Sequence, residues 1–187
     1  QLKHYGIKKI NLAVGYKSSI IKNYFNNNML DFEISFIDNG DVDIIERIKS
    51  VVKKNSYEDA MILYGDTISD VKIDELMMFS KENKKYSILT VWPLQTNFGI
   101  IELNNKQEII EFKEKPKLDK YINIGYFVLR KEFFKYLDNY DNYADFLTFC
   151  GNNKLLKAFV HNGEHFTVNN VVELKLAEKN LNKIKIF

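Results

Sequence analysis

Hydrophobic residues change their spacing along the chain, and each spacing predicts a type of element. Residues 7–14 are rich in aliphatic side chains and predict a strand that ends at Gly15. Over residues 19–28, apolar positions recur at helical spacing, which predicts an amphipathic helix. Residues 32–37 alternate between apolar and polar, as in a second strand, and residues 44–52 return to helical spacing.

An unbroken apolar run at 61–64 leads directly into Gly65 and Asp66. Such a run, closed by a glycine, is typical of a buried parallel strand. The order to this point is strand, helix, strand, helix, strand, which favours parallel strands joined by right-handed crossovers. Asp70 is expected to cap a third helix, whose apolar face falls within residues 73–79.

The second half has shorter spacings that favour antiparallel pairing. A tight-turn signal, Asn104-Asn105, separates two of its predicted strands. Two helices, two more strands and a closing helix follow. The predicted strands are 87–92, 98–103, 108–112, 122–129, 155–160 and 164–168, and the predicted helices are 131–138, 143–150 and 174–184.

These elements predict an α/β fold with a Rossmann-like mixed sheet that is mostly parallel. Helices are expected on both faces of the sheet, and antiparallel strands in its second half. With 187 residues, the chain is long enough for one domain, 1–187, with a substantial core. Residues 1–6 have the pattern of the last turn of a helix stopped by Gly6, so we expect further structure upstream.

Composition narrows the classes of function. The formal net charge is +2, and the arginines are Arg47 and Arg130, which gives little support for nucleic-acid binding. A single cysteine, Cys150, excludes a disulfide within the chain and a cysteine-rich zinc site. The sequence shows no signal peptide and no apolar run near the ~20 residues that span a bilayer. We therefore expect a cytoplasmic protein without a membrane partner.

Three clusters of polar residues lie at the ends of predicted strands. Gly65-Asp66 follows one strand, Glu114-Lys115 precedes Pro116, and an Asn-x-Gly motif, residues 123–125, enters another. Mg²⁺ prefers one or two carboxylates together with substrate phosphates, and lysine binds phosphate as a point charge. Each cluster alone also has an ordinary interpretation, as a turn or as a solvated charged surface.

The ordered set of motifs resembles the sugar-1-phosphate nucleotidyltransferases, and among them the glucose-1-phosphate cytidylyltransferases. The resemblance extends from Gly6 to about Glu178, and its pieces appear in family order and near family spacing. The motifs are Gly15-Tyr-Lys17, Ile37-Asp-Asn-Gly-Asp41, Tyr64-Gly-Asp66, Phe98-Gly99, Phe112-Lys-Glu-Lys-Pro-Lys117 and Ile122-Asn-Ile-Gly-Tyr-Phe127.

The resemblance implies a role for each matched residue. Asp66 corresponds to the catalytic aspartate that binds Mg²⁺ beside the nucleotide, and Lys115 to a catalytic lysine. Glu114 and Lys115 would contact the sugar and its phosphate, and Asn123 and Gly125 would form part of the sugar pocket. Two further glycines in the matched motifs, Gly65 and Gly99, are expected to contribute to substrate binding.

The resemblance also implies a reaction. The oxygen of a sugar 1-phosphate attacks the α-phosphorus of a nucleoside triphosphate, with CTP favoured, to give a nucleotide sugar and pyrophosphate. Catalysis of this kind depends mostly on positioning and charge neutralisation. The implied cofactor is Mg²⁺, the implied assembly is a homo-oligomer, and the product would feed polysaccharide biosynthesis.

Several positions depart from the family pattern. The glycine-rich loop, expected within an N-terminal strand-loop-helix, would precede Gln1. The glycine pair that contacts the base corresponds to Ile45-Glu46, and the second metal aspartate corresponds to Asn169. Two interpretations follow: an active transferase in the intact gene product, with this chain alone inactive, or a catalytically degenerate binding or regulatory module on the same fold.

Overall fold

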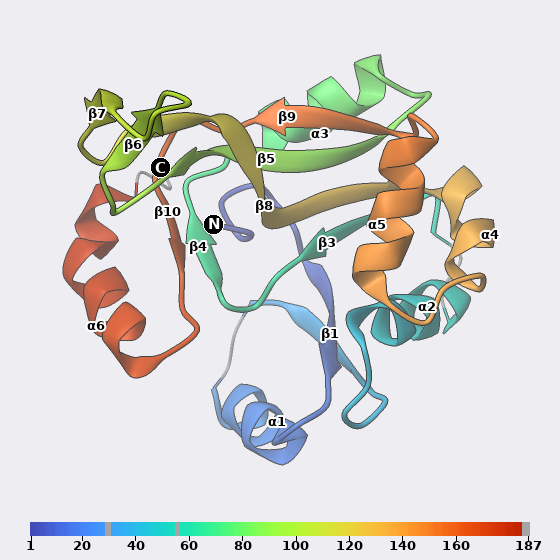
Figure 1. Ribbon diagram of the computed structural model, residues 1–187. Helices are drawn as coiled ribbons and strands as arrows, with labels where there is room; N and C mark the ends of the chain where they lie inside the picture. Colours follow the sequence, from blue (N-terminus) through green and yellow to red (C-terminus); the bar gives the residue numbers. More distant parts are fainter. Residues whose placement is uncertain (29–30, 55–56, 185–187) are drawn as a thin grey trace.

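The computed structural model describes residues 1–28, 31–54 and 57–184 (Figure 1). Nearly every predicted element is present within these ranges. The strands are β1 (Lys9–Val14), β2 (Glu33–Asp38), β3 (Asp59–Leu63), β4 (Thr67–Ser69), β5 (Ser87–Gln95), β6 (Ile100–Leu103), β7 (Ile109–Lys113), β8 (Lys117–Arg130), β9 (Leu156–Val160) and β10 (His165–Thr167). The α-helices are α1 (Ser18–Asn27), α2 (Ile44–Lys54), α3 (Ile73–Glu82), α4 (Phe134–Leu137), α5 (Tyr143–Asn152) and α6 (Val171–Asn180).

The first two strands form a parallel pair, as their order in the sequence predicts. β1 and β2 run in register from Lys9 opposite Glu33 to Val14 opposite Asp38, and α1 connects them. Where the last turn of a helix was predicted, residues 2–6 form a hydrogen-bonded turn before β1, and Gly6 adopts a φ of +71° that favours glycine.

The main sheet has four strands in the order β3-β8-β5-β9. The apolar run at 61–64 lies in and just after β3, but the prediction of a buried parallel strand was wrong. β3 is half-buried and pairs antiparallel with β8, with Leu63 opposite Tyr126. A continuous apolar run indicates that the strand is covered on both faces. It carries no information on strand direction, which depends on the partner, and the partner β8 lies far along the chain.

Two hydrophobic cores cover opposite faces of β8, because successive side chains of a strand point to opposite sides. Phe127 and Leu129 enter one core with residues of α2 and α5, and Tyr126 and Val128 enter the other with Leu76 of α3. Figure 1 shows the helices that provide these two cores around the central strands. The prediction of helices on both faces is therefore confirmed.

Many aromatic residues between Phe133 and Phe149 belong to the first core. Tyr143 and Phe146 are buried there, together with the fully buried Cys150. Burial raises the pKa of the Cys150 thiol to about 11, so this cysteine acts as a small hydrophobic residue.

The short strand β4 was not predicted, and its neighbour Asp70 does not cap α3. The helix begins after Lys72 without a side-chain cap. Instead, the Asp70 carboxylate accepts a hydrogen bond from the Glu164 amide at 2.8 Å and lies 3.0 Å from His161 Nε2. These contacts hold the loop before β10 against β4, and β4 and β10 pair antiparallel.

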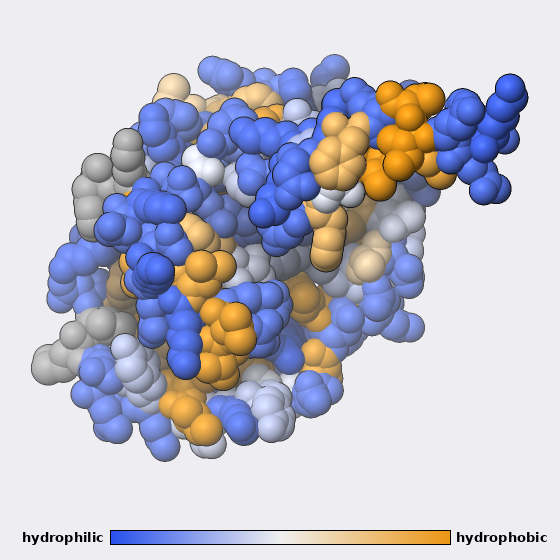
Figure 2. Space-filling view, turned by 60° about the vertical axis from the view of Figure 1, so that its left-hand side comes forward, coloured by the Kyte–Doolittle hydropathy of each residue, from blue (hydrophilic) through white to orange (hydrophobic). Residues whose placement is uncertain are grey.

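Strands β6 and β7 form a two-stranded ribbon outside the main sheet, with the predicted turn at Asn104. Hydrophobic side chains lie exposed among hydrophilic ones on the face in Figure 2. The exposed apolar residues of this ribbon are Ile101, Leu103, Ile109, Ile110 and Phe112. None of the helices in the described ranges has the length and apolar character needed to cross a bilayer.

The mixed α/β class is thus confirmed, with both parallel and antiparallel strands. Two of the six described strand pairings are parallel, β1 with β2 and β5 with β9. The parallel share is smaller than the sequence suggested, because β8 is antiparallel to both of its neighbours.

Candidate functional site

Asn123 and Gly125 lie together where β8 passes the end of β3. The Asn123 side chain accepts a hydrogen bond from the Gly125 amide at 2.9 Å, and its amide nitrogen lies 3.2 Å from the Tyr64 hydroxyl. The Tyr64 amide in turn donates to the Gly125 carbonyl at 3.0 Å. The structure therefore brings these predicted residues together with Tyr64, which immediately precedes Gly65 and Asp66.

Gly125 is required at its position for two reasons. Its φ of +78° lies in the left-handed region, and a Cβ there would lie 2.5 Å from Tyr64 ring atoms. No side chain fits so close to a ring without displacing it. The Asn-x-Gly motif is therefore not an isolated turn. It allows β8 to pack closely against Tyr64, the residue before Gly65.

Asp66 stands in the exposed turn between β3 and β4. Its carboxylate makes no ion pair with any described residue, and it accepts a hydrogen bond from the Thr67 hydroxyl at 3.5 Å. The Val168 amide donates to the Asp66 carbonyl at 2.9 Å, so the residue after Val168, Asn169, lies beside this turn. The two predicted metal ligands thus come from neighbouring segments.

The side chain of Asn169 has another partner. Its amide nitrogen donates to Glu173 at 3.1 Å, and the Glu173 carboxylate also accepts from the Asn169 backbone at 2.7 Å. These hydrogen bonds, the backbone one first, lower the pKa of Glu173. The carbonyl oxygen of Asn169 remains as a possible ligand. One exposed carboxylate and an amide oxygen fit Mg²⁺ that takes its remaining ligands from phosphates and water.

Glu114 and Lys115 form a second group with Gly99 at the end of the β6–β7 ribbon. The Lys115 ammonium lies 3.9 Å from the Glu114 carboxylate, and both side chains are exposed. A Cβ at Gly99 would lie 2.7 Å from the Phe112 ring and 3.3 Å from Glu114 Oε2, so this glycine allows close packing. Lys115 has a φ of +47°, an uncommon backbone conformation that is often associated with function.

No hydrogen bond or ion pair in the described part of the chain joins the Glu114 group to the Asp66 group. Strand β8 connects them, because Lys117 starts it and Asn123 lies further along. At about 3.3 Å per residue, the path along the strand between these two positions is about 20 Å. The Glu114 group therefore lies near the start of β8, and the Asp66 group lies beside its middle.

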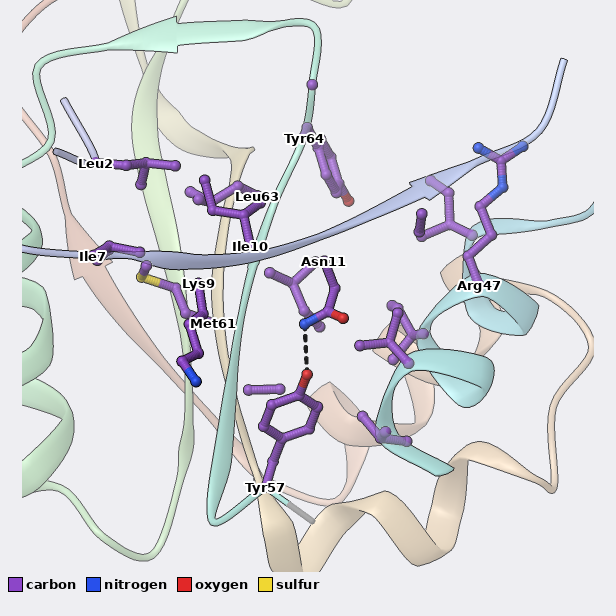
Figure 3. Close-up of a pocket in the computed structure, with 18 of the residues that line it drawn as sticks. Leu2, Ile7, Lys9, Ile10, Asn11, Arg47, Tyr57, Met61, Leu63 and Tyr64 are labelled. Atoms are coloured by element: carbon purple, nitrogen blue, oxygen red, sulfur yellow. Dashed lines mark hydrogen bonds between the residues drawn. The ribbon is translucent and has the colours of Figure 1, made fainter. Parts of the chain in front are cut away.

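A hollow of about 670 Å³ lies next to Asp66, between β1, α2 and β3 (Figure 3). Aliphatic side chains line most of it, including Ile10 and Leu63, and a 2.6 Å hydrogen bond from Asn11 to Tyr57 crosses it. Arg47 extends from α2 near the end of β1, on the opposite side of the view from Leu2. In the described residues, β1 pairs with β2 and β3 with β8, so each has one edge without a strand partner.

Sequence reasoning did not identify Tyr64 or Arg47 as site residues. The Tyr64 hydroxyl also lies near Tyr143, and burial raises the pKa of the Tyr143 phenol. Tyr64 ends an apolar run and so was interpreted as part of a strand. Arg47 occupies one position of an amphipathic helix, where an arginine carries no local signal of function.

Comparison with known proteins finds one matching family, described as Nucleotidyl transferase, over residues 6–167. The chain is 28% identical over 162 residues to a glucose-1-phosphate cytidylyltransferase of Salmonella typhimurium, which covers 72% of the chain and 62% of that protein. It is 32% identical over 135 residues to a D-glycero-alpha-D-manno-heptose 1-phosphate guanylyltransferase of Campylobacter jejuni, which covers 71% of the chain and 60% of the relative.

Among solved structures, a Bacillus anthracis protein described as a glucose-1-phosphate thymidylyltransferase superposes with a TM-score of 0.72 at 17% identity. The match covers 98% of this chain and 80% of that one, and it supports the fold. The chain spans about three fifths of the length of the two curated relatives. The names of these three proteins differ in the nucleotide that they specify.

Proposed function

This chain belongs to the sugar-1-phosphate nucleotidyltransferase family, and we propose that the intact gene product transfers a nucleotidyl group from a nucleoside triphosphate to a sugar 1-phosphate. The products are a nucleotide sugar, for polysaccharide biosynthesis, and pyrophosphate. The grouping of Asp66, Asn123 and Gly125 where β3 and β8 meet is the observation that supports this most strongly. CTP is the favoured donor, on the resemblance to the cytidylyltransferases.

In the proposed reaction, a phosphate oxygen of the sugar 1-phosphate attacks the α-phosphorus, and the bond to pyrophosphate breaks. Asp66, with the carbonyl of Asn169, would hold Mg²⁺, which supplies charge neutralisation for the phosphates. Lys115 neutralises the attacking phosphate, and Glu114 contacts the sugar. Asn123 orients the sugar ring, since its side chain is already fixed by the Gly125 amide.

Three glycines have a supporting role in this proposal. Gly65 and Gly99 let the backbone approach the substrates closely, and Gly125 keeps the Tyr64 ring against the wall of the sugar pocket. Gly99 already allows close packing by Phe112, and a Cβ at Gly65 would have no neighbour within 4 Å. A backbone amide in such an open turn is accessible to a phosphate.

Residues 1–187 form one nucleotidyltransferase-like domain that an N-terminal strand-loop-helix completes, in our proposal. The hollow between β1 and β3 supports this, because a strand there would gain partners on two free edges and bury aliphatic side chains. Coding sequence upstream of Gln1 is expected to specify a glycine-rich loop with an arginine and a following Lys-Pro. Upstream sequence of any other kind would contradict this part of the proposal.

Pyrophosphate release tests the reaction. The intact gene product, with glucose 1-phosphate and each of the common nucleoside triphosphates in turn, is expected to release pyrophosphate fastest with CTP. Residues 1–187 alone are expected to release little. Faster release with another triphosphate would contradict the proposed preference for CTP. No release with any combination of these substrates would refute the proposed activity.

A second candidate is a binding or regulatory module without turnover. Ile45, where the resemblance places one glycine of the base-contacting pair, is fully buried, and Glu46 pairs with Lys49 at 2.5 Å. The Ile45 side chain is thus buried and the partly exposed Glu46 carboxylate already has a cation partner, while Asn169 brings no charge. Calorimetry separates the candidates: nucleotide binding without pyrophosphate release, unchanged in Asn169→Asp, favours the module, whereas recovery of turnover in Asn169→Asp favours the enzyme.

The protein is also proposed to form a homo-oligomer through the β6–β7 ribbon. Ile109, Ile110 and Phe112 are each about 60% exposed there, which is unusual for a solvated surface. Sedimentation velocity should show an oligomer for the wild type and a smaller species for Ile110→Lys. A monomeric wild type would exclude this assembly.

A further inference from the structure

Arg47 lines the hollow and has no ion-pair partner among the residues that the structure describes. Its Nε–H group is buried and donates to no described residue, and no described carboxylate forms an ion pair with its guanidinium. The other arginine, Arg130, is by contrast fully engaged, with Asp59 and two carbonyl groups. A buried polar nitrogen left unpaired costs free energy, so it indicates that a ligand completes the site.

Three acidic residues of β2, α2 and the loop between them have other partners. Asp38 pairs with Lys22 at 2.6 Å, Asp43 accepts from the Ile45 amide at 2.9 Å, and Glu46 pairs with Lys49. These three carboxylates are therefore engaged by groups other than Arg47. The positive charge of the guanidinium remains available for an anion from outside the described chain.

The position of Arg47 is that of a ligand-binding residue. It lies in the first turns of α2, beside the loops that follow the parallel strands β1 and β2. A Cβ at Gly15 would lie 2.8 Å from Arg47 Nη2 and 2.1 Å from the Gly40 carbonyl, so the glycine gives the guanidinium room. Ligands in open α/β sheets bind outside the carboxyl ends of the strands.

We infer that Arg47 binds a phosphate group of the nucleoside triphosphate from the side of the hollow. Arg47 and Asp66 both line this hollow, whereas Glu114 and Lys115 lie on the β6–β7 side. The planar guanidinium binds phosphate through paired hydrogen bonds, which lysine cannot reproduce. This inference rests on the proposed function for the identity of the anion. It assigns the triphosphate to the hollow beside α2 and the sugar phosphate to the side of the β6–β7 ribbon.

Chemical modification tests this without any substitution. Butanedione modifies accessible arginines, and peptide mass mapping distinguishes the two in this chain. In the intact gene product, Arg47 is expected to react and Arg130, which is 8% exposed, to remain unmodified. Inorganic tripolyphosphate should protect Arg47, and glucose 1-phosphate should not. Equal modification with and without tripolyphosphate, or protection by glucose 1-phosphate alone, would overturn the inference.

Variants give the magnitude. Arg47→Gln should weaken the binding of tripolyphosphate and of CTP by about 10-fold or more, the loss expected for a charge-assisted hydrogen bond. Arg47→Lys should recover part of the loss. Lys53→Gln is the matched control, because it removes a positive charge from the same helix where Lys53 pairs with Asp138. Equal losses in Arg47→Gln and Lys53→Gln would overturn the inference.

The two hypotheses fail separately. If the wild type releases pyrophosphate and Arg47→Gln keeps its KM for the triphosphate, the inference fails and the proposed function stands. If tripolyphosphate binding depends on Arg47 but no pyrophosphate is released, the inference stands and the transferase activity fails.

Discussion

Replacing Gly125 by alanine tests the contact on which the shape of the candidate site depends. The substitution forces a side chain into a backbone with a φ of +78° and places its Cβ 2.5 Å from Tyr64 ring atoms. Two costs follow: backbone strain in the left-handed region and a steric overlap with the ring. Both arise at a position that also donates the hydrogen bond fixing Asn123.

The size of the effect follows from these two terms. A left-handed conformation costs an alanine about 1–2 kcal/mol relative to glycine. Overpacking costs about 1–3 kcal/mol in addition, because the Tyr64 ring must move. For a domain of this size, each kcal/mol lowers Tm by about 2–4 °C. We therefore expect Gly125→Ala to lower the free energy of unfolding by about 2–5 kcal/mol.

Gly6→Ala is the matched control. Gly6 has a φ of +71°, but a Cβ there would have no neighbour within 4 Å, so only the strain term applies. Urea unfolding should show a larger loss for Gly125→Ala than for Gly6→Ala. The loss at Gly125 should shrink in a Tyr64→Ala background, where the ring is absent. Equal losses at the two glycines, or an unchanged loss without the ring, would refute the reasoning.

Three further predictions concern the core. Asp59→Ala should cost about 3 kcal/mol in urea unfolding because it leaves the buried Arg130 unpaired, whereas Glu58→Ala, from an exposed pair, should cost under about 0.5 kcal/mol. Cys150, with a pKa raised to about 11 by burial, should resist iodoacetamide in the native protein and react in denaturant; reaction at equal rates would contradict this. Burial, and secondly the neighbouring His161 imidazole, lower the pKa of His165, so the unfolded chain binds more protons than the native protein below pH 6.5. The free energy of unfolding should therefore fall as the pH drops through about 6.5, and it should fall less in His165→Gln. Equal pH dependence of unfolding in the wild type and His165→Gln would exclude this.

The sequence predicted which segments are strands and helices better than it predicted their partners. The run at 61–64 carries the hydrophobicity of a strand but no information on direction, which β8 determines from a distant part of the chain. Asp70 is a residue type that often caps helices, yet its carboxylate instead contacts the buried His161 and accepts a hydrogen bond from the Glu164 amide. Local propensity is overridden wherever a tertiary partner is available.

The candidate site divides in the same way. Asp66, Asn123 and Gly125 could be predicted as site residues because carboxylates, amides and glycines at strand ends form recognisable patterns. Tyr64 and Arg47 could not be found from spacing, since a strand tyrosine and a helix arginine are ordinary in their elements. Their importance comes from the contact with Gly125 and from the hollow beside α2, both of which exist only in the folded chain.

The most direct measurement of the central claim compares the intact gene product with its Asp66→Asn variant in pyrophosphate release at saturating Mg²⁺, CTP and glucose 1-phosphate. Asp66 is exposed and forms no ion pair with a described residue, so the substitution should leave Tm unchanged. The account predicts that the variant loses activity by about 100-fold or more, because a metal-binding carboxylate is removed from a site that works by charge neutralisation. Equal rates of release by the two folded proteins would contradict it.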